Sequence, residues 1–373
     1  MTETSGAELT IDLGAVQANY QTLRGHLGEA ELAAVVKADA YGLGLAPVVR
    51  ALRRAGCETF FVATAAEGME LRAIQSDAHI HVFNGPLPGE EAAFTEHTLV
   101  PVLNSLDQLQ NWSAQGVRVG APGPADIQID TGMTRLGLDP DDLARLMAEP
   151  DLMKSVPLDL VLSHLACAEQ PDHAMNPEQL AAFESGCAQL GTQIGAIRRS
   201  LAASSGIFLG RQYHFDMTRA GAALFGVNPT PLGSNPMRQV IRIQGKILQV
   251  RSVDTVRSVG YGASHQATRP AKIATVAIGY GDGYPRALSN AGTAFIDSHE
   301  VPVVGRVSMD LTTLDVTEVP SRLLALGQPV DFVGPLNSVD QLAAQAGTIG
   351  YEILTNLGRR YRRRYVGGEG NSG

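Results

Sequence analysis

The sequence has few cysteines, no long apolar run and no leader-like start. Its three cysteines, Cys57, Cys167 and Cys187, form no Cys-x-x-Cys pair, which argues against a disulfide framework and a zinc ribbon. No stretch approaches the roughly 18 uncharged apolar residues of a membrane-spanning helix. Residues 1–15 are polar and acidic, without the basic and apolar segments of a signal peptide. These absences predict a soluble, cytoplasmic protein with no membrane partner and no metal centre.

Positive charge is also scarce. The chain carries 29 lysines and arginines against 38 aspartates and glutamates, a net charge of −9. Because phosphate neutralisation needs clustered cations, this balance argues against a nucleic-acid partner. The exception is a group of five arginines around Tyr361, between positions 359 and 364. At a chain end, such a group is more typical of a solvated or subunit-facing strand.

Apolar residues and glycine are plentiful. Hydrophobic residues make up 44% of the chain, charged residues 18%, and the mean hydropathy is +0.00, which is too apolar for intrinsic disorder. The 40 glycines are about 11% of the 373 residues, against roughly 7% in typical globular chains, and follow no repeating period. Length and composition predict two domains, or one large barrel with an addition.

Residues 1–235 alternate between short apolar runs and helix-period segments. The eight runs rich in Val, Ile and Phe are Ala33–Ala38, Thr59–Thr64, His79–Phe83, Leu99–Leu103, Asp126–Asp130, Leu158–His164, Arg198–Ala203 and His214–Arg219. Helix-period segments such as Leu45–Arg54, Glu67–Ile74, Leu106–Ala114 and Pro177–Leu190 separate them. The unbroken rhythm predicts a (β/α)8 barrel over residues 1–235, and a doubly wound sheet is the alternative.

After about Pro236 the pattern changes. Apolar runs follow one another with turns between them and almost no helix, at Val240–Val250, Ala271–Ile278, Thr293–Ile296, Val301–Arg306 and Pro329–Val333. This predicts a mainly β domain over residues 236–373, and roughly the first ten residues of the chain are expected to pack with it. One late helix is predicted over 339–357, with Ser338 as its N-cap and Gly358 after its end.

Lys37 lies at the end of the first predicted barrel strand, before a glycine-rich turn. The carboxyl ends of barrel strands are where barrels keep their active sites. Val35 and Val36 are expected to exclude water from the lysine, which lowers the pKa of its amine toward a nucleophilic range. By itself, a strand-end lysine that reaches solvent is the commoner case.

The segment AVVKADAYGLG, from Ala34 to Gly44, resembles the cofactor-lysine motif of the alanine racemases, fold-type III enzymes that use pyridoxal 5′-phosphate. The resemblance recurs at separated motifs over nearly the whole chain. It implies a homodimeric isomerase that interconverts L- and D-alanine for peptidoglycan. It also implies that Lys37 holds the cofactor covalently and that Tyr41 contacts the cofactor phosphate.

The segment DTGMTRLG, residues 130–137, is the second match. It implies that Arg135 lies near the cofactor's phenolic oxygen and the substrate carboxylate. The planar guanidinium suits this role because it can donate two parallel hydrogen bonds to a carboxylate. Two positions before it, where the family commonly has a carbamylated lysine, this chain has Gln128. Either the amide oxygen orients Arg135, or an anion such as chloride binds beside the amide nitrogen. We favour the anion.

His164 is the last residue of the sixth predicted strand, in SHLAC. Its spacing to Cys167 and His173 matches no common zinc pattern, and a buried core histidine is the ordinary interpretation. The resemblance implies a cofactor-site residue that is hydrogen-bonded toward Arg219 and coupled to the catalytic tyrosine.

The loops after the seventh and eighth strands of a barrel often hold phosphate. Ser204, Gly221 and Ala222 lie there and are predicted to form the phosphate cradle. Arg219 matches the arginine that faces the pyridine nitrogen. Because an arginine stays protonated, it gives no proton to that nitrogen, which favours racemisation over transamination.

The β domain is predicted to complete the site. By resemblance, Tyr261 in SVGYG is the second catalytic base, opposite Lys37, and Met309 in GRVSMD binds the substrate carboxylate through its N–H. A tyrosine, with a pKa near 10, needs cationic support, here ascribed to the His164–Arg219 pair. Both residues are expected to come from the partner subunit.

Tyr284 is predicted at the entrance of the site and to bind substrate. Tyr351 is placed opposite it, beside Ile349, and is also expected to contact the cofactor. Glu169-Gln170 stands where the family commonly has two acidic residues, so access for the substrate is expected to differ in detail.

Three other functions remain open at this point. The nearest is a serine or broad-specificity racemase of the same family. A pyridoxal-phosphate-binding homeostasis protein shares the lysine motif but lacks a β domain with residues like Tyr261 and Met309. A fold-type III decarboxylase would normally place an acidic residue where this chain has Arg219.

Overall fold

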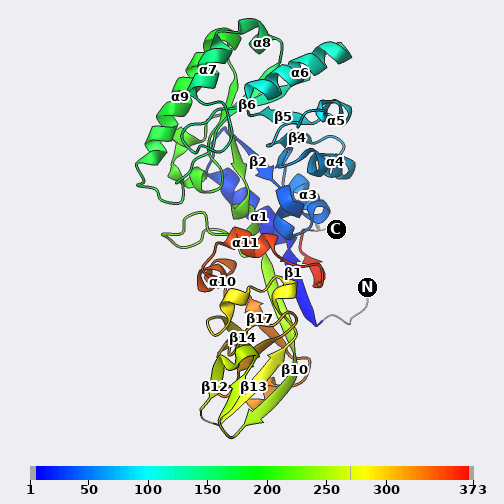
Figure 1. Cartoon of the computed structure of the whole chain (residues 1–373), viewed down its shortest axis with the longest axis vertical. Helices are drawn as coiled ribbons and strands as arrows, with labels where there is room; N and C mark the ends of the chain where they lie inside the picture. The colour runs from blue at the N-terminus through cyan, green and yellow to red at the C-terminus, as the bar shows by residue number, and fades with distance from the viewer. Residues whose placement is uncertain (1–5, 122, 269, 369–373) are drawn as a thin grey trace.

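Eight parallel strands form the sheet of the N-terminal half (Figure 1). The computed structural model describes residues 6–121, 123–268 and 270–368. In chain order the barrel strands are β2 (Glu31–Val35), β3 (Thr59–Val62), β4 (His79–Val82), β5 (Val100–Leu103), β6 (Ala125–Gln128), β7 (Leu158–Leu162), β8 (Arg198–Ser200) and β9 (Met217–Ala220). From β2 to β8 each strand pairs with the next, β2 also pairs with β9, and a parallel bridge between Ala203, just after β8, and Arg219 of β9 closes the barrel. The predicted barrel is confirmed, and the doubly wound alternative is wrong.

One helix precedes the first barrel strand, and others lie between the barrel strands (Figure 1). They are α1 (Leu13–Gly25), α2 (Lys37–Gly42), α3 (Leu45–Arg54), α4 (Ala65–Ile74), α5 (Glu91–Glu96), α6 (Leu106–Val119), α7 (Pro140–Met147), α8 (Pro150–Lys154) and α9 (Met175–Ile194). Polar side chains fix several starts, because they accept hydrogen bonds from N–H groups that lack a partner inside the helix. Ser105 begins α6 and Asp139 begins α7 in this way.

The C-terminal half is mainly β (Figure 1). Its strands are β10 (Ile241–Val253), β11 (Arg257–Val259), β12 (His265–Ala267), β13 (Ala271–Val276), β14 (Thr293–Ile296), β15 (His299–Pro302), β16 (Thr312–Asp315), β17 (Pro329–Val333) and β18 (Arg362–Val366). The first strand of the chain, β1 (Ala7–Asp12), pairs antiparallel with β10 and parallel with β18. Short 3-10 helices occupy Ser205–Leu209, Arg211–Tyr213, Ala222–Phe225, Tyr261–Ala263, Tyr280–Asp282, Arg286–Leu288 and Ser321–Leu323.

The late helix predicted over 339–357 is two helices, α10 (Val339–Ala346) and α11 (Gly350–Thr355). Ser338 caps the first of them through a capping box with Gln341. Gly347 ends α10 in the left-handed conformation, with φ 70°, and Ile349 is extended. A left-handed glycine followed by an extended residue stops a helix, which the apolar periodicity does not reveal.

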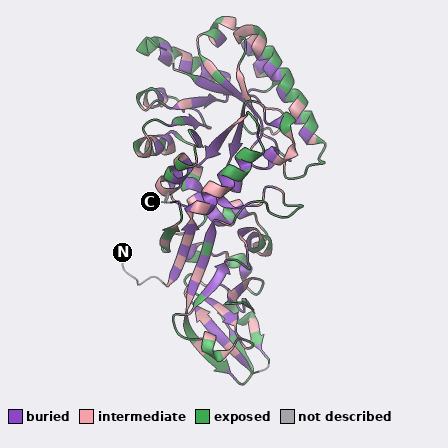
Figure 2. Cartoon of the chain, turned by 180° about the vertical axis from the view of Figure 1, so that it is seen from behind, coloured by how far each residue is buried: buried purple, intermediate pink, exposed green. Residues whose placement is uncertain are grey.

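Burial follows this architecture. In Figure 2 the barrel strands are coloured mostly as buried, whereas the outer faces of the helices are exposed. The arginine-rich segment near the C-terminus forms β18 at the edge of the β sheet. In the described part of the chain, no helix combines the length and apolarity needed to span a membrane.

Candidate active site

Seven of the predicted site residues meet at one end of the barrel. Lys37 follows β2, Arg135 follows β6, His164 follows β7 and Ser204 follows β8. The others are at or after the end of β9 or in the turn after Lys37: Arg219, Gly221 and Tyr41. Because parallel strands end at the same edge of a barrel, this arrangement gathers their side chains at the carboxyl end of the sheet.

Lys37 is half-buried, with its Nζ 5.7 Å from the centroid of the Phe83 ring. Burial lowers the pKa of the amine, and the positive charge of Arg135 lowers it further, while the negative charge of Glu67 opposes them. Both lowering effects disfavour the ammonium form. The amine is therefore closer to a nucleophilic state than an exposed lysine.

The turn after Lys37 is left-handed. Four residues without glycine's freedom, Ala38, Asp39, Ala40 and Tyr41, have φ between 52° and 57°. This conformation costs an L-residue about 1–2 kcal/mol. Hydrogen bonds hold it, from the Ala38 N–H to Glu67 Oε1 at 2.7 Å and from the Leu45 N–H to Asp39 Oδ1 at 2.7 Å. A strained turn that the surrounding chain maintains is typical of a functional site.

A hydroxyl and amide cradle lies between this turn and β9. Ser204 Oγ accepts hydrogen bonds from the N–H groups of Gly221, at 3.0 Å, and Ala223, at 3.3 Å. A Cβ on Gly221 would lie 2.4 Å from the Tyr41 hydroxyl oxygen, so a side chain there would fill the space beside that hydroxyl. Hydroxyls and backbone N–H groups are phosphate ligands, so these residues fit the phosphate of the predicted cofactor. Ala222, also predicted there, is buried beside Gly221.

Arg219 is a fully enclosed cation, 2% exposed. Its guanidinium donates hydrogen bonds to Ser163 O at 2.6 Å, Ser200 O at 2.9 Å and Ser200 Oγ at 2.5 Å. Burial lowers the pKa of Arg219 to about 10, and the charge of Asp126 opposes this. The side chain therefore stays protonated at neutral pH despite its burial.

His164 differs from its prediction in two ways. Among the described residues, the hydrogen bonds of the Arg219 guanidinium go to Ser163, Ser200 and Leu201, and none goes to His164. Burial, and then the charges of Arg219, Arg135 and Lys37, lower the pKa of His164 to about 3. The imidazole is therefore neutral at pH 7. Of the His164–Arg219 pair that was predicted to support Tyr261, only Arg219 carries positive charge.

Gln179, in α9, was missed by the sequence reasoning. Its Nε2 donates to His164 O at 3.0 Å and to Thr131 Oγ1 at 3.1 Å, and its Oε1 accepts from the Ala166 N–H at 2.8 Å. It is 0% exposed. A glutamine on the inner face of a helix was the available signal, because a buried amide needs partners.

The side chain of Gln128 contacts the backbone of the loop that carries Arg135. The amide Nε2 donates to Leu136 O at 3.0 Å, next to Arg135, which is exposed. Asp130 closes the other side of the loop by accepting from the N–H groups of Gly132, Met133 and Thr134. The glutamine thus anchors the loop, and whether an anion binds beside it stays a prediction.

Tyr261 and Met309 lie on the β domain. They are 71% and 54% exposed. In Figure 1, β12, which follows Tyr261, is drawn at the end of the β domain far from the barrel. The segment directly before β12, which carries Tyr261, is therefore not brought to the barrel within one chain, and both exposed side chains are accessible to a second molecule.

Tyr284 is not at an entrance. It is 2% exposed, and its ring packs edge-on against Phe332 with centroids 4.8 Å apart. Burial raises the pKa of its hydroxyl, which has no hydrogen-bond partner in the described part of the chain. The prediction is wrong because the side chain belongs to the core of the β domain.

Tyr280, four residues earlier, is the exposed tyrosine of this segment. It is 42% exposed, and its N–H donates to Ser308 O at 3.0 Å, beside Met309. A Cβ on Gly279 would lie 2.3 Å from that same oxygen, so the close approach requires glycine. The glycines on both sides of Tyr280 were the signal that could have identified it.

Tyr351, in α11, faces the left-handed turn of residues 38–41, here called the cofactor turn. Its ring is 6.3 Å from the ring of Tyr41, centroid to centroid. Burial, followed by the charge of Glu169, raises the pKa of Tyr351 to about 12. The Glu169-Gln170 segment, which departs from the family pattern, therefore lies beside this tyrosine. Ile349 is 60% exposed.

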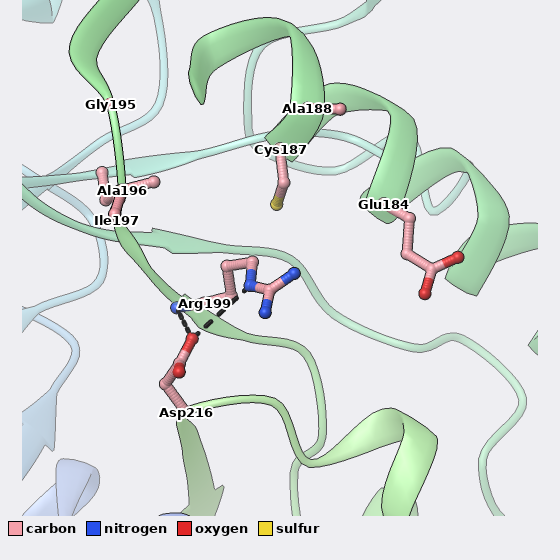
Figure 3. A pocket seen from close by; sticks show the side chains of 8 residues that line it. All are labelled: Glu184, Cys187, Ala188, Gly195, Ala196, Ile197, Arg199 and Asp216. Carbon is pink, nitrogen blue, oxygen red and sulfur yellow. Dashed lines mark hydrogen bonds and ion pairs between the residues drawn. The ribbon is translucent and has the colours of Figure 1, made fainter. Parts of the chain in front are cut away.

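A separate hollow of about 360 Å³ lies at the other end of the barrel (Figure 3). Cys187 and Glu184 of α9 face Arg199 and Asp216, which hydrogen-bond to each other where β8 and β9 begin. Strands begin there and Lys37 lies where they end, so this hollow is remote from the predicted chemistry.

Comparisons with known proteins match the two halves of the chain. Residues 11–229 match the family model "Alanine racemase, N-terminal domain", and residues 240–365 match "Alanine racemase, C-terminal domain". An alanine racemase of Rhodospirillum rubrum is 49% identical over 369 residues, 98% of each chain. A catabolic alanine racemase of Agrobacterium fabrum is 45% identical over 363 residues, 97% of this chain and 92% of the relative.

A solved structure is similar over the whole length. It is the alanine racemase from Bartonella henselae with covalently bound pyridoxal phosphate, with a TM-score of 0.93 and 39% identity over 97% of this chain and 100% of that chain. Barrel and β domain together define an amino-acid racemase, an isomerase. The chain belongs to the alanine racemase family.

Proposed function

We propose that this protein racemises alanine with pyridoxal 5′-phosphate bound at Lys37, by a two-base mechanism that uses Lys37 and Tyr261. The observation that carries the proposal is the juxtaposition of an amine of lowered pKa with a cradle of hydroxyls and N–H groups at the carboxyl end of the barrel. The covalently bound pyridoxal phosphate of the Bartonella henselae relative supports the cofactor assignment.

The cofactor would be held by Lys37 through its amine, by Tyr41, Ser204, Gly221 and Ala222 around the phosphate, and by His164, Arg219, Arg135 and Tyr351 around the remainder. When bound, pyridoxal phosphate supplies an electron sink for the charge that forms at the substrate α-carbon. Arg219 stays protonated, and its two terminal nitrogens donate to carbonyl and hydroxyl oxygens. It therefore holds a positive charge near the cofactor without acting as a proton donor.

Two groups exchange the α-proton. Inversion of the stereocentre requires proton removal on one face and proton return on the other. Lys37 serves one face and Tyr261 the other. Arg135 and the Met309 N–H hold the substrate carboxylate, since a carboxylate accepts parallel hydrogen bonds from a guanidinium.

The site requires a homodimer. Tyr261 and Met309 are exposed on the β domain of the chain that carries them, so the partner subunit supplies them to each barrel. Tyr280, beside Met309, replaces Tyr284 as the tyrosine at the entrance. Each monomer alone has an incomplete site, and activity depends on the dimer.

Alanine is the substrate that we favour. The reaction takes place in the cytoplasm and supplies D-alanine for peptidoglycan precursors. A serine or broad-specificity racemase is the alternative within the same chemistry. Tyr351 and Ile349 narrow the pocket in favour of a small side chain, although one methyl-sized difference discriminates by only about 10–200-fold.

A role restricted to cofactor binding and homeostasis is the second candidate. It requires the lysine turn and the phosphate cradle but no second base. The exposed Tyr261 and Met309 favour the racemase, because a carrier protein would have no use for them.

A panel of amino acids tests the proposal. Purified protein with added pyridoxal phosphate is incubated with each enantiomer of alanine, serine, lysine and arginine, and the products are separated by chiral chromatography. We expect the fastest racemisation with alanine. Racemisation of none of the four would contradict the proposal, and a faster rate with serine would favour the alternative.

A further inference from the structure

The two carboxylate oxygens of Glu67 accept hydrogen bonds at the ends of two different strands. Oε2 accepts hydrogen bonds from the N–H groups of Ala63, at 2.7 Å, and Thr64, at 3.3 Å, just after β3. Oε1 accepts from the N–H of Ala38, at 2.7 Å, just after β2. A capping box accounts for the bond to Thr64, at the start of α4. It does not account for the oxygen directed at Ala38.

The N–H of Ala38 belongs to the peptide group that follows Lys37. Rotation about the Cα–C bond of Lys37 moves this peptide group relative to the lysine side chain, because a peptide group is rigid and planar. A carboxylate fixed to the end of β3 and bound to this N–H therefore fixes the direction in which the chain leaves Lys37. The left-handed residues 38–41 follow immediately.

A strained turn needs such a partner. Each of the four successive left-handed residues is in an unfavourable conformation, and the turn persists only if its neighbours hold it. A hydrogen bond from an N–H to an ionised carboxylate is among the strongest available. Glu67 is half-buried and Ala38 is exposed, so the bond between them is open to water.

We propose that Glu67 is a positioning residue for Lys37. It anchors the peptide group after the lysine to the end of β3 and so aims the amine at the cofactor site. This inference rests on the proposed function, because it assumes that Lys37 is the residue that captures pyridoxal phosphate. Glu67 lies outside the motifs that resemble the alanine racemases. Its other hydrogen bonds are those of an ordinary capping box at the start of α4.

The charges around Lys37 predict how the pH profile changes. Arg135, from the loop after β6, and His164, after β7, face the lysine together with Glu67, from α4. His164 is neutral near pH 7, so Arg135 and Glu67 are the charged pair. Glu67 stabilises the ammonium form. Its neutralisation lowers the pKa of Lys37 further and moves cofactor capture to lower pH.

Thr64 provides a matched control. Its Oγ1 accepts from the Glu67 N–H at 3.3 Å, in the same capping box. Thr64→Ala weakens the start of α4 but leaves the Glu67 carboxylate bonded to the Ala38 N–H. Glu67→Ala removes both functions. Glu67→Gln keeps the shape and one oxygen acceptor and removes the charge.

The test measures cofactor capture by the apoprotein. Pyridoxal phosphate is mixed with wild type, Glu67→Ala, Glu67→Gln and Thr64→Ala over a range of pH, and the bond to Lys37 is followed by visible absorbance. Tm of each apoprotein is measured in parallel. We expect Tm to fall in both Glu67→Ala and Thr64→Ala, and further in Glu67→Ala because it loses more hydrogen bonds, but roughly tenfold slower capture only in Glu67→Ala. Glu67→Gln is expected to shift the pH profile to lower pH.

Two results would overturn the inference in different ways. Capture rates and pH profiles in both Glu67 variants that equal those of Thr64→Ala would reduce Glu67 to its capping role, while the proposed function would stand. A wild-type protein that captures no pyridoxal phosphate would overturn the proposed function and this inference with it.

Discussion

Arg363, in the last strand, donates a hydrogen bond of 2.6 Å from its guanidinium to the carbonyl oxygen of Gly42. Two residues further along, the Tyr365 hydroxyl donates to Leu43 O at 3.0 Å. The end of the chain thus holds the end of the turn that begins at Lys37. Since β18 also pairs with β1, the cofactor turn and the β sheet are connected through one strand.

This connection predicts that β18 contributes to cofactor binding. Arg363→Met removes the donor and retains the length of the side chain. We expect a lower Tm and pyridoxal phosphate binding weakened roughly tenfold, because one charged hydrogen bond to the turn is lost. Equilibrium titration of the apoprotein measures the affinity. Arg362→Ala, at an exposed position of the same strand, is the control, and an equal loss in both variants would contradict the prediction.

Lys37→Ala is expected to abolish covalent capture of the cofactor. The cradle around Ser204 remains, so weak, dialysable binding of pyridoxal phosphate persists while the absorbance of the covalently bound form disappears. Absorbance before and after dialysis measures both. A variant that retains the covalent band would place the cofactor on another lysine.

Tyr261→Phe is expected to affect the two enantiomers unequally. The tyrosine serves one face of the substrate, so removal of the α-proton from one enantiomer slows far more than removal from the other. Single-turnover exchange of the α-proton with deuterated solvent measures each direction. Equal losses from L- and D-alanine would refute the assignment of two bases to two faces.

The two tyrosines of the 279–285 segment are expected to separate binding from stability. Tyr280→Ala raises KM for alanine by roughly fivefold, the effect of a lost contact worth about 1 kcal/mol, and leaves Tm near that of wild type. Tyr284→Phe removes a buried hydroxyl without a partner in the described part of the chain and leaves KM unchanged. Its free energy of unfolding is equal to or slightly above that of wild type. The reverse assignment would be supported if Tyr284→Phe changed KM.

His164 is expected to make stability fall with acid. Its pKa in the folded protein, about 3, lies below that of an unfolded histidine, so the unfolded chain binds more protons between these values. The free energy of unfolding therefore falls as pH drops from about 6.5 toward 3. Urea unfolding of the apoprotein at pH 7 and pH 5 measures the slope. A His164→Asn variant with an unchanged slope would contradict this account.

The barrel was predictable from the sequence because its signal is local. Val36, Phe61 and Ile80 lie in apolar runs that are too short for helices and recur between amphipathic segments, and the structure has strands there or directly beside them. The break between α10 and α11 was missed, since it depends on the left-handed conformation of Gly347, which periodicity does not encode.

The site was predictable in part. Lys37 is at the end of one predicted strand and Ser204 and Gly221 follow two others, so the barrel itself places them together. The burial of Tyr284 depends on Phe332, which is distant in sequence, and the neutrality of His164 depends on burial and on cations from other strands. The hydrogen bond from the Ala38 N–H to Glu67 Oε1 was not predictable from the sequence either, because Ala38 lies at the end of a different strand.

The central claim is that each active site combines the barrel of one subunit with the β domain of the other. Inactive Lys37→Ala and Tyr261→Phe proteins are mixed under conditions that exchange subunits, and alanine racemisation is measured. In a mixed dimer, one site has both Lys37 and Tyr261, so we expect about a quarter of wild-type activity after full exchange of equal amounts. Activity that never rises above that of the two separate variants would contradict the shared site.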